Sequence, residues 1–128
     1  QKYVESQSHR GRPYIGEYLD EVTGYWLKGD QERARYYNHS TFNDLMITGL
    51  AGLRPRADRT LEVNPLLPDS EWDWFCLDNV RYHNHIITIV WDRHGDRYHM
   101  GKGLTVMVDG KKVGNRPTLG RIICENVL

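Results

Sequence analysis

From residue 60 onward the chain is a series of short segments whose apolar residues recur at every second position. This period is that of a β-strand, because successive side chains of a strand point to opposite faces. The expected strands are 60–63, 72–77, 79–82, 85–92, 104–108, 111–114 and 119–124. Short strands with turn signals about 8 to 12 residues apart are typical of an antiparallel β-sandwich. The predicted fold is therefore mainly β: an antiparallel β-sandwich preceded by a long loop and one α-helix.

Two local patterns support this fold class. The run "IITIVW" (86–91) is rich in β-branched residues, which favour strands, and Trp91 at its end is expected in the core. Asp109-Gly110 lies between apolar flanks and predicts a two-residue hairpin turn. Gly95 within "DRHGDRY" indicates a second turn.

The only expected helix runs from Thr41 to Leu53, with Ser40 or Thr41 as its cap. Its apolar face is predicted to contain Leu45, Met46, Ile47, Leu50 and Leu53. Gly49 and Gly52 weaken a helix, so they are expected to permit close packing. Pro55 is expected to end the helix.

Before this helix, residues 1–38 contain helix-breaking glycines and Pro13 but few apolar repeats. A start of this length without regular structure is unusual in a compact domain. It predicts a long ordered loop, or a segment that needs a partner surface. Two parts follow: residues 1–53 as the remnant of a larger domain, and residues 54–128 as the sandwich.

Composition excludes some partners. The chain has 17 Lys and Arg against 17 Asp and Glu, whereas nucleic-acid binding usually needs a basic excess. The densest basic stretch, Arg54 to Arg59, is interrupted by Asp58 and is expected to be a solvated turn. The sequence has no run of 18 apolar residues, so it predicts no membrane-spanning helix. Cys76 and Cys124 are expected to be reduced, buried thiols, with one disulfide as the alternative, which leaves the compartment open.

The aromatic cluster "EWDWF" is the first candidate binding site. In a strand, Trp72 and Trp74 would share one face, with Asp73 on the other. Exposed indole rings can stack on sugar rings while carboxylates bind the sugar hydroxyls. The same tryptophans can equally pack into the sandwich core or against a neighbouring layer.

Histidines suggest a second candidate site. His83 and His85 would point to one side of a strand, a spacing found in metal sites of cupin type. His94 and His99 are the candidates for further ligands. The alternative is that these histidines are polar residues beside turns.

A third candidate lies in "GEYLDEVTG" (16–24), where Glu17 stands among Tyr18 and Trp26. A carboxylate among aromatic residues suits sugar hydrolysis, in which it deprotonates water. An exposed polar loop explains the same composition. The chain has neither a Gly-rich phosphate loop nor a G-x-S-x-G motif, and no cofactor is expected.

Four motifs carry a resemblance to a known family: "YNHSTFNDL", "GLRPRAD", "EVNPLLP" and "WDWFCLDNV". With the rest of residues 10–121, they resemble the C-terminal end of bacterial six-hairpin, (α/α)6-barrel glycoside hydrolases. The trehalase-like and mannosylglycerate-hydrolase-like group is the most similar.

The resemblance implies roles for single residues. Glu17 corresponds to the catalytic general base, and Tyr18 and Tyr37 would line that site. Residues 41–53 correspond to the last barrel helix, and the strands after them to an appended sandwich. A periplasmic or secreted location is favoured.

Most of such a barrel, with its general acid, has no counterpart in this sequence, so hydrolysis by this chain alone is not expected. Three functions remain open: a carbohydrate-binding accessory module, a structural buttress of the barrel, and a small enzyme that uses Glu17 or a metal held by His83 and His85. The apolar face of helix 41–53 must be covered, either by the sandwich or by a second copy of the chain. A homo-oligomer through this helix is therefore predicted.

Overall fold

The structure is a computed structural model that describes residues 5–16, 18–27 and 41–128. The chain divides into two compact units, residues 1–41 and residues 42–128. In the first unit, β1 (Ser8–His9) pairs antiparallel with β2 (Arg12–Pro13). The predicted long loop thus contains a hairpin, whose two-residue strands are too short to give a periodic pattern.

The first unit also has an aromatic cluster. Tyr14 is buried, and its ring meets the ring of Trp26 edge to face at a centroid distance of 5.4 Å. The indole nitrogen of Trp26 donates a hydrogen bond of 2.7 Å to the carbonyl of Ser6. A Cβ added to Gly16 would lie 2.8 Å from the indole ring, so this cluster requires glycine there.

The second unit begins with α2 (Phe42–Asp44), which continues as the π-helical η2 (Leu45–Leu50). The wider π-helical turn is visible in the hydrogen bond of 2.9 Å from the Ala51 N–H to the Met46 carbonyl. The predicted helix is confirmed at its start and wrong at its end. It stops at Leu50, and Leu53 is a buried residue of β3 (Leu53–Arg54).

Gly52, rather than Pro55, turns the chain out of the helix. Its φ of +80° lies in the left-handed region that glycine adopts readily. A Cβ added there would lie 2.1 Å from the carbonyl carbon of Asn64, so the predicted close packing is confirmed at Gly52. It is wrong at Gly49, where an added Cβ would meet no atom within 4 Å in the part of the chain that the structure describes.

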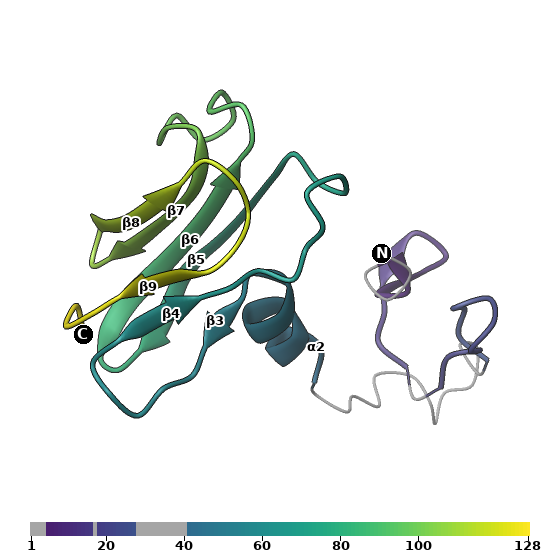
Figure 1. The fold of residues 1–128 in the computed structure, drawn as a ribbon. Helices are drawn as coiled ribbons and strands as arrows, with labels where there is room; N and C mark the ends of the chain where they lie inside the picture. Colours follow the sequence, from purple (N-terminus) through teal and green to yellow (C-terminus); the bar gives the residue numbers. More distant parts are fainter. Residues whose placement is uncertain (1–4, 17, 28–40) are drawn as a thin grey trace. The chain divides into compact units, whose positions relative to one another are not determined.

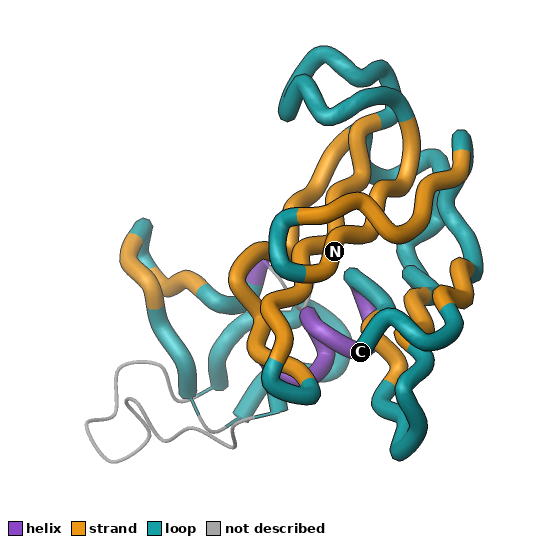
Figure 2. The backbone as a smooth tube through the Cα atoms, turned by 90° about the vertical axis from the view of Figure 1, so that its left-hand side faces the viewer, coloured by secondary structure: helices purple, strands orange, loops and turns teal. Residues whose placement is uncertain are grey.

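The strands of the second unit form two antiparallel sheets, as the predicted fold class required (Figure 1). The smaller sheet has the order β3-β4-β9, with β4 at Leu61–Val63 and β9 at Ile122–Cys124. The larger sheet has the order β5-β6-β7-β8, with bounds Trp74–Tyr82, His85–Asp92, Gly103–Val108 and Lys111–Arg116. A view turned by 90° shows the same strands from the side (Figure 2).

The strand boundaries differ from the predicted ones in two informative places. The predicted strands 72–77 and 79–82 are one strand, β5, with an irregularity between Leu77 and Val80. Asn79 in that interval has a φ of +60°, as expected at a bulge. The Asp109-Gly110 hairpin is confirmed, because both residues have the positive φ that a type I′ turn requires.

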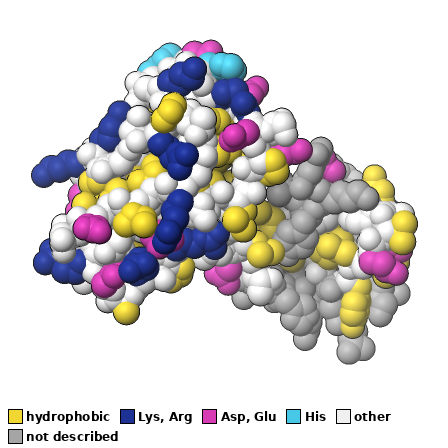
Figure 3. Space-filling view, in the orientation of Figure 1, with side chains coloured by type: hydrophobic (Ala, Val, Ile, Leu, Met, Phe, Trp, Pro, Cys, Tyr) yellow, Lys and Arg dark blue, Asp and Glu magenta, His cyan; other side chains and the backbone are white. Residues whose placement is uncertain are grey.

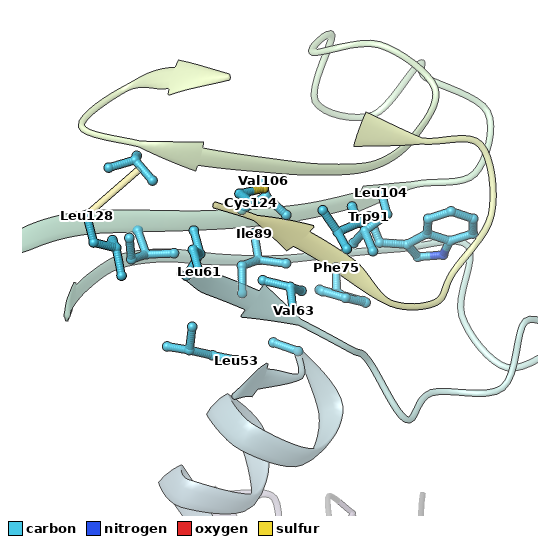
Figure 4. Packing of buried hydrophobic residues seen from close by; sticks show 14 residues of the cluster. Leu53, Leu61, Val63, Phe75, Ile89, Trp91, Leu104, Val106, Cys124 and Leu128 are labelled. Atoms are coloured by element: carbon cyan, nitrogen blue, oxygen red, sulfur yellow. The ribbon is translucent and has the colours of Figure 1, made fainter. Parts of the chain in front are cut away.

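One hydrophobic core joins the two sheets. Leu61 and Val63 of β4 and Ile87 and Ile89 of β6 are each fully buried in it. Figure 4 shows side chains of both sheets pointing toward one another. Trp91 is 2% exposed, which confirms its predicted place in the core. The interlocking of side chains from β4 and β9 with those from β5 to β7 gives the second unit its sandwich character.

The Arg-Pro-Arg turn is held by internal partners. The Arg56 guanidinium donates to Asp58 at 2.7 Å and to Glu62 at 3.0 Å. Arg121 donates a hydrogen bond to the other carboxylate oxygen of Glu62. This hydrogen bond is the largest of the effects that lower the pKa of Glu62. The expected solvated turn is therefore an exposed ion-pair network. On the face drawn in Figure 3, basic and acidic side chains are interspersed in the same way.

The two cysteines are free; Cys124 is buried and Cys76 is exposed. The expectation of two buried thiols is therefore wrong for Cys76. Among the described residues, no helix is both long and apolar enough to cross a lipid bilayer.

Candidate functional site

A groove of about 540 Å³ opens where β5 begins. Its lining residues are consecutive except for one: Glu71, Trp72, Asp73, Trp74, Phe75, Cys76 and Tyr98. The groove thus contains the aromatic cluster that the sequence singled out as a sugar platform. The exception, Tyr98, comes from the loop between β6 and β7, far from the others in sequence.

The two tryptophans of the groove have different surroundings. Trp74 is the first residue of β5, pairs with Asp92, and is 47% exposed. Trp72 lies before the strand, so the prediction that both tryptophans belong to it is wrong. Trp72 is half-buried against the core, and its carbonyl accepts a hydrogen bond of 3.0 Å from the indole nitrogen of Trp91. Trp74 is the more accessible ring, whereas Trp72 anchors the groove to the core.

Two residues of the loop after β6 contact the Trp74 ring. The guanidinium carbon of Arg97 lies 4.4 Å from the ring centroid, at cation–π distance. The ring of Tyr98 meets the indole edge to face, with centroids 6.3 Å apart and planes at 78°. Trp74 is therefore held in place by neighbours on more than one side while almost half of its surface remains open.

Asp92, the last residue of β6, fixes this loop. Its carboxylate is buried and accepts hydrogen bonds from three backbone N–H groups, those of Gly95 at 2.8 Å, Arg97 at 2.9 Å and Tyr98 at 2.9 Å. Burial acts to raise the pKa of Asp92, but the hydrogen bonds outweigh it, so the pKa is lowered. Asp92 is thus ionised and bound to the backbone of the residues that contact Trp74.

The groove carries charges of both signs. Asp73 forms an ion pair of 2.7 Å with Arg93, and the Asp73 carbonyl accepts the Arg93 N–H. Burial raises the pKa of Tyr98, which keeps its hydroxyl protonated and able to donate. Partial burial of the otherwise exposed Cys76, assisted by the nearby Asp78, also raises the pKa of its thiol, so this thiol is not an activated nucleophile. The groove therefore offers hydrogen-bonding groups beside an aromatic ring.

Asp92 makes the groove sensitive to acid. Its folded-state pKa lies below the ordinary value of 3.8, so its contribution to stability is complete above that value and is lost as the pH falls through the folded-state pKa. As the pH falls below 3.8 and Asp92 becomes protonated, we expect Arg97 and Tyr98 to be released. The fluorescence of Trp74 should then change. The same titration of Asp92→Asn is the control, and a transition that persists in this variant would assign it to another group.

His83 and His85 both lie at the turn that joins β5 to β6. His83 lies in the turn with a φ of +49°, and its ring is 4.4 Å from the ring of Tyr82. His85 Nδ1 lies 2.7 Å from a carboxylate oxygen of Asp109. Within the described ranges, no three or more His, Cys, Asp or Glu side chains are grouped so as to hold a metal ion. The prediction that both rings lie side by side on a strand is wrong, because the two-residue turn includes His83.

The remaining predicted site residues belong to the first unit or fall outside the description. Glu17 and Tyr37 lie outside the described residues. Tyr18 is 46% exposed, and its carbonyl accepts the N–H of Leu27. Trp26 is half-buried in the aromatic cluster around Tyr14. Trp72, Asp73 and Trp74 are the predicted residues that the structure brings together in one groove.

Sequence reasoning missed Asp92, Arg97 and Tyr98. A usable signal was present, because an Asp at a strand end followed by a glycine three residues later is typical of a type I β-turn. No periodic pattern, however, relates Tyr98 to Trp74, because only the pairing of β5 with β6 brings the two residues close together. Contacts of this kind depend on tertiary structure.

Comparison with known proteins finds a family model that matches the part of the chain containing this groove. Residues 53–115 match the family model described as "Glycosyl hydrolase family 65, C-terminal domain", and this range includes every residue that lines the groove. A solved structure titled "Sialidase" matches with 75% sequence identity and a TM-score of 0.88 over 98% of this chain. The chain spans 12% of the length of that sialidase, so the match concerns a small part of a large protein.

These matches confirm the predicted relationship to the C-terminal part of a glycoside hydrolase. They do not distinguish a trehalase-like from a mannosylglycerate-hydrolase-like relative. Residues 53–115 are therefore similar in sequence to the C-terminal domain of glycosyl hydrolase family 65.

Proposed function

We propose that the chain is part of a glycoside hydrolase and that its groove at the start of β5 binds a sugar ring of an oligo- or polysaccharide. The observation that carries this proposal is Trp74, 47% exposed, inside a mainly apolar groove that Glu71, Asp73 and Tyr98 also line. A tryptophan face matches the C–H face of a pyranose ring, and neighbouring polar groups bind its hydroxyls.

Several groups are available for the hydroxyls. Glu71 and Asp73 are exposed carboxylates at the groove, and the Tyr98 hydroxyl is a donor and an acceptor. Asp73 keeps one strong partner, Arg93, so a sugar hydroxyl would join an existing ion pair. The site thus combines one large apolar contact with a few directed hydrogen bonds, as small-molecule sites commonly do.

Replacing Trp74 by alanine tests this proposal. We expect glycan affinity, measured by affinity electrophoresis on a panel of soluble polysaccharides, to fall about tenfold or more, as for a central aromatic contact. Tyr25→Ala is the matched control, because Tyr25 is an aromatic residue of the first unit with 77% exposure. A folded wild-type protein that is retarded by no glycan would contradict the proposal.

A structural buttress is the second candidate function, and Trp72 is the observation that favours it. Trp72 is half-buried, and its carbonyl is hydrogen-bonded to Trp91. Part of the aromatic cluster therefore stabilises the fold and is not available to bind a ligand. Acrylamide quenching distinguishes the two functions. Sugar binding requires that Trp74 be quenched and that glycan protect it, whereas a buttress predicts no protection by any glycan.

We also propose, on the family resemblance alone, that Glu17 occupies the general-base position, without catalysis by this chain alone. A glycosidase needs two carboxylates, about 6.5–9.5 Å apart in an inverting enzyme. We therefore expect no hydrolysis by the chain alone and no change of this result in Glu17→Gln. Turnover of any glycoside by the wild type, lost in Glu17→Gln, would reverse this expectation.

Self-association through the helical segment is also proposed, now on a smaller surface. Ile47 and Leu50 pack against the sandwich core, whereas Leu45 is 48% exposed. We expect Leu45→Glu to lower the mass measured by light scattering at high concentration, because a charge in an apolar contact is costly. A wild-type monomer at all concentrations would contradict self-association. A periplasmic or secreted location is proposed on the family resemblance alone.

A further inference from the structure

We propose that Asp92 is the positioning residue of the groove: it holds the rim loop, defined as residues 93–99, in the conformation that places Arg97 and Tyr98 against Trp74. This inference rests on the proposed sugar site for its functional meaning. Its structural content, the dependence of the Trp74 surroundings on Asp92, stands independently of any ligand.

The first step is the geometry of the carboxylate. One oxygen of Asp92 accepts the N–H of Gly95, and the other accepts the N–H groups of Arg97 and Tyr98. Asp92 is 1% exposed, and its backbone pairs with Trp74 on one side and Gly103 on the other. The carboxylate is therefore fixed by the sheet and in turn fixes three residues of the rim loop.

The second step is what the loop presents. Arg97 and Tyr98 are bound to Asp92 through their backbone N–H groups, which leaves their side chains available to contact the Trp74 ring. These are the two side chains that contact the Trp74 ring, at 4.4 Å and 6.3 Å between the centres given above. The residue that pairs with Trp74 in the sheet thus also binds the backbone of its two side-chain neighbours. One carboxylate sets both the position and the environment of the proposed stacking ring.

The third step separates this role from general stability. Gly95 has a φ of +82°, and a Cβ there would lie 3.0 Å from the backbone nitrogen of Lys102, so the rim loop is tightly turned. Its backbone N–H groups converge on one side chain, so the loop conformation depends on that side chain rather than on the core. Loss of Asp92 is therefore expected to change the groove more than the two sheets.

Asp92→Asn tests the proposal with little change of side-chain volume. The amide retains one acceptor oxygen and replaces the other with a donor, which faces N–H groups instead of accepting from them. The N–H groups that face the new amide nitrogen lose their acceptor: those of Arg97 and Tyr98, or that of Gly95 if the side-chain amide is oriented the other way. We expect these amide protons to exchange with solvent at least tenfold faster, as measured by hydrogen-exchange NMR. The indole N–H signal of Trp74 should shift, while amide protons in β7 should keep their exchange rates.

The matched control is Asp96→Asn, which removes the same charge from an exposed residue of the same loop. It should leave both signals unchanged. If Asp92→Asn does not fold, acid titration of the wild type replaces it, with the same signals expected to change before global unfolding. Unchanged exchange rates and an unshifted Trp74 signal in folded Asp92→Asn would overturn the proposal. An acid titration in which these signals change only when the whole protein unfolds would also overturn it.

Glycan binding is a separate readout. If wild-type protein binds a glycan, Asp92→Asn should weaken that binding about as much as Trp74→Ala, and Asp96→Asn should not. If no glycan binds but the Trp74 signal shifts, the positioning role holds and the proposed sugar site fails. If a glycan binds equally well to the wild type and to Asp92→Asn, Asp92 does not position the site, and the positioning proposal fails alone.

Discussion

Replacing Gly52 by alanine is expected to destabilise the second unit by about 3 kcal/mol or more. Two costs combine: a left-handed backbone costs a residue with a Cβ roughly 1–2 kcal/mol, and overpacking against fixed atoms costs about 1–3 kcal/mol. The new Cβ would lie 2.1–2.3 Å from backbone atoms of Asn64 and Pro65, which no side-chain rotation relieves. Urea unfolding followed by circular dichroism measures the change.

Gly49→Ala is the matched control three residues earlier. There an added Cβ meets no described atom within 4 Å, and alanine is the better helix former by about 1 kcal/mol. The two substitutions are thus expected to change stability in opposite directions. Equal effects at Gly49 and Gly52 would show that the exit from the helix does not pass beside Asn64.

Leu61→Ala is expected to cost about 2–5 kcal/mol, the usual range for emptying a fully buried leucine site. Leu61 is the first residue of β4, is 0% exposed, and pairs with Cys124 of β9. Its side chain joins the core cluster that also contains residues of the four-stranded sheet. The cost therefore measures how strongly the two sheets depend on each other.

Ile123→Ala provides the comparison on the same small sheet. Ile123 lies between two buried residues of β9 but is itself 47% exposed. A surface position of this kind should change stability by no more than about 0.5 kcal/mol. If both substitutions had similarly small effects, the core would not extend across the two sheets.

The fold was largely predictable because its signals are local. β6 and the Asp109-Gly110 hairpin follow from β-branched runs and from residues that tolerate positive φ. The end of the helix was not predictable from Pro55 alone, since the close approach of Asn64 at Gly52 decides it. The strand at Leu53 was missed for the same reason: two residues carry no period, and pairing with Val63 is what makes them a strand.

The candidate site was predictable only in part. "EWDWF" identified Trp72, Asp73 and Trp74 because aromatic and acidic residues are adjacent there in sequence. Tyr98, which completes the groove lining, and Arg97, which contacts the Trp74 ring, reach Trp74 only through a sheet register and a loop folded around Asp92. Side chains 23 or more residues apart in sequence meet through tertiary contacts, which no spacing rule reveals.

The proposed sugar site is tested most directly by following the Trp74 indole N–H signal while soluble oligosaccharides are added. A glycan that binds in the groove should shift this signal in a saturable way and leave the buried Trp91 signal unchanged. The same glycan should bind Trp74→Ala about tenfold more weakly or not at all. Binding that shifts other signals and is equally strong in Trp74→Ala would contradict the account, because the ligand would then bind elsewhere.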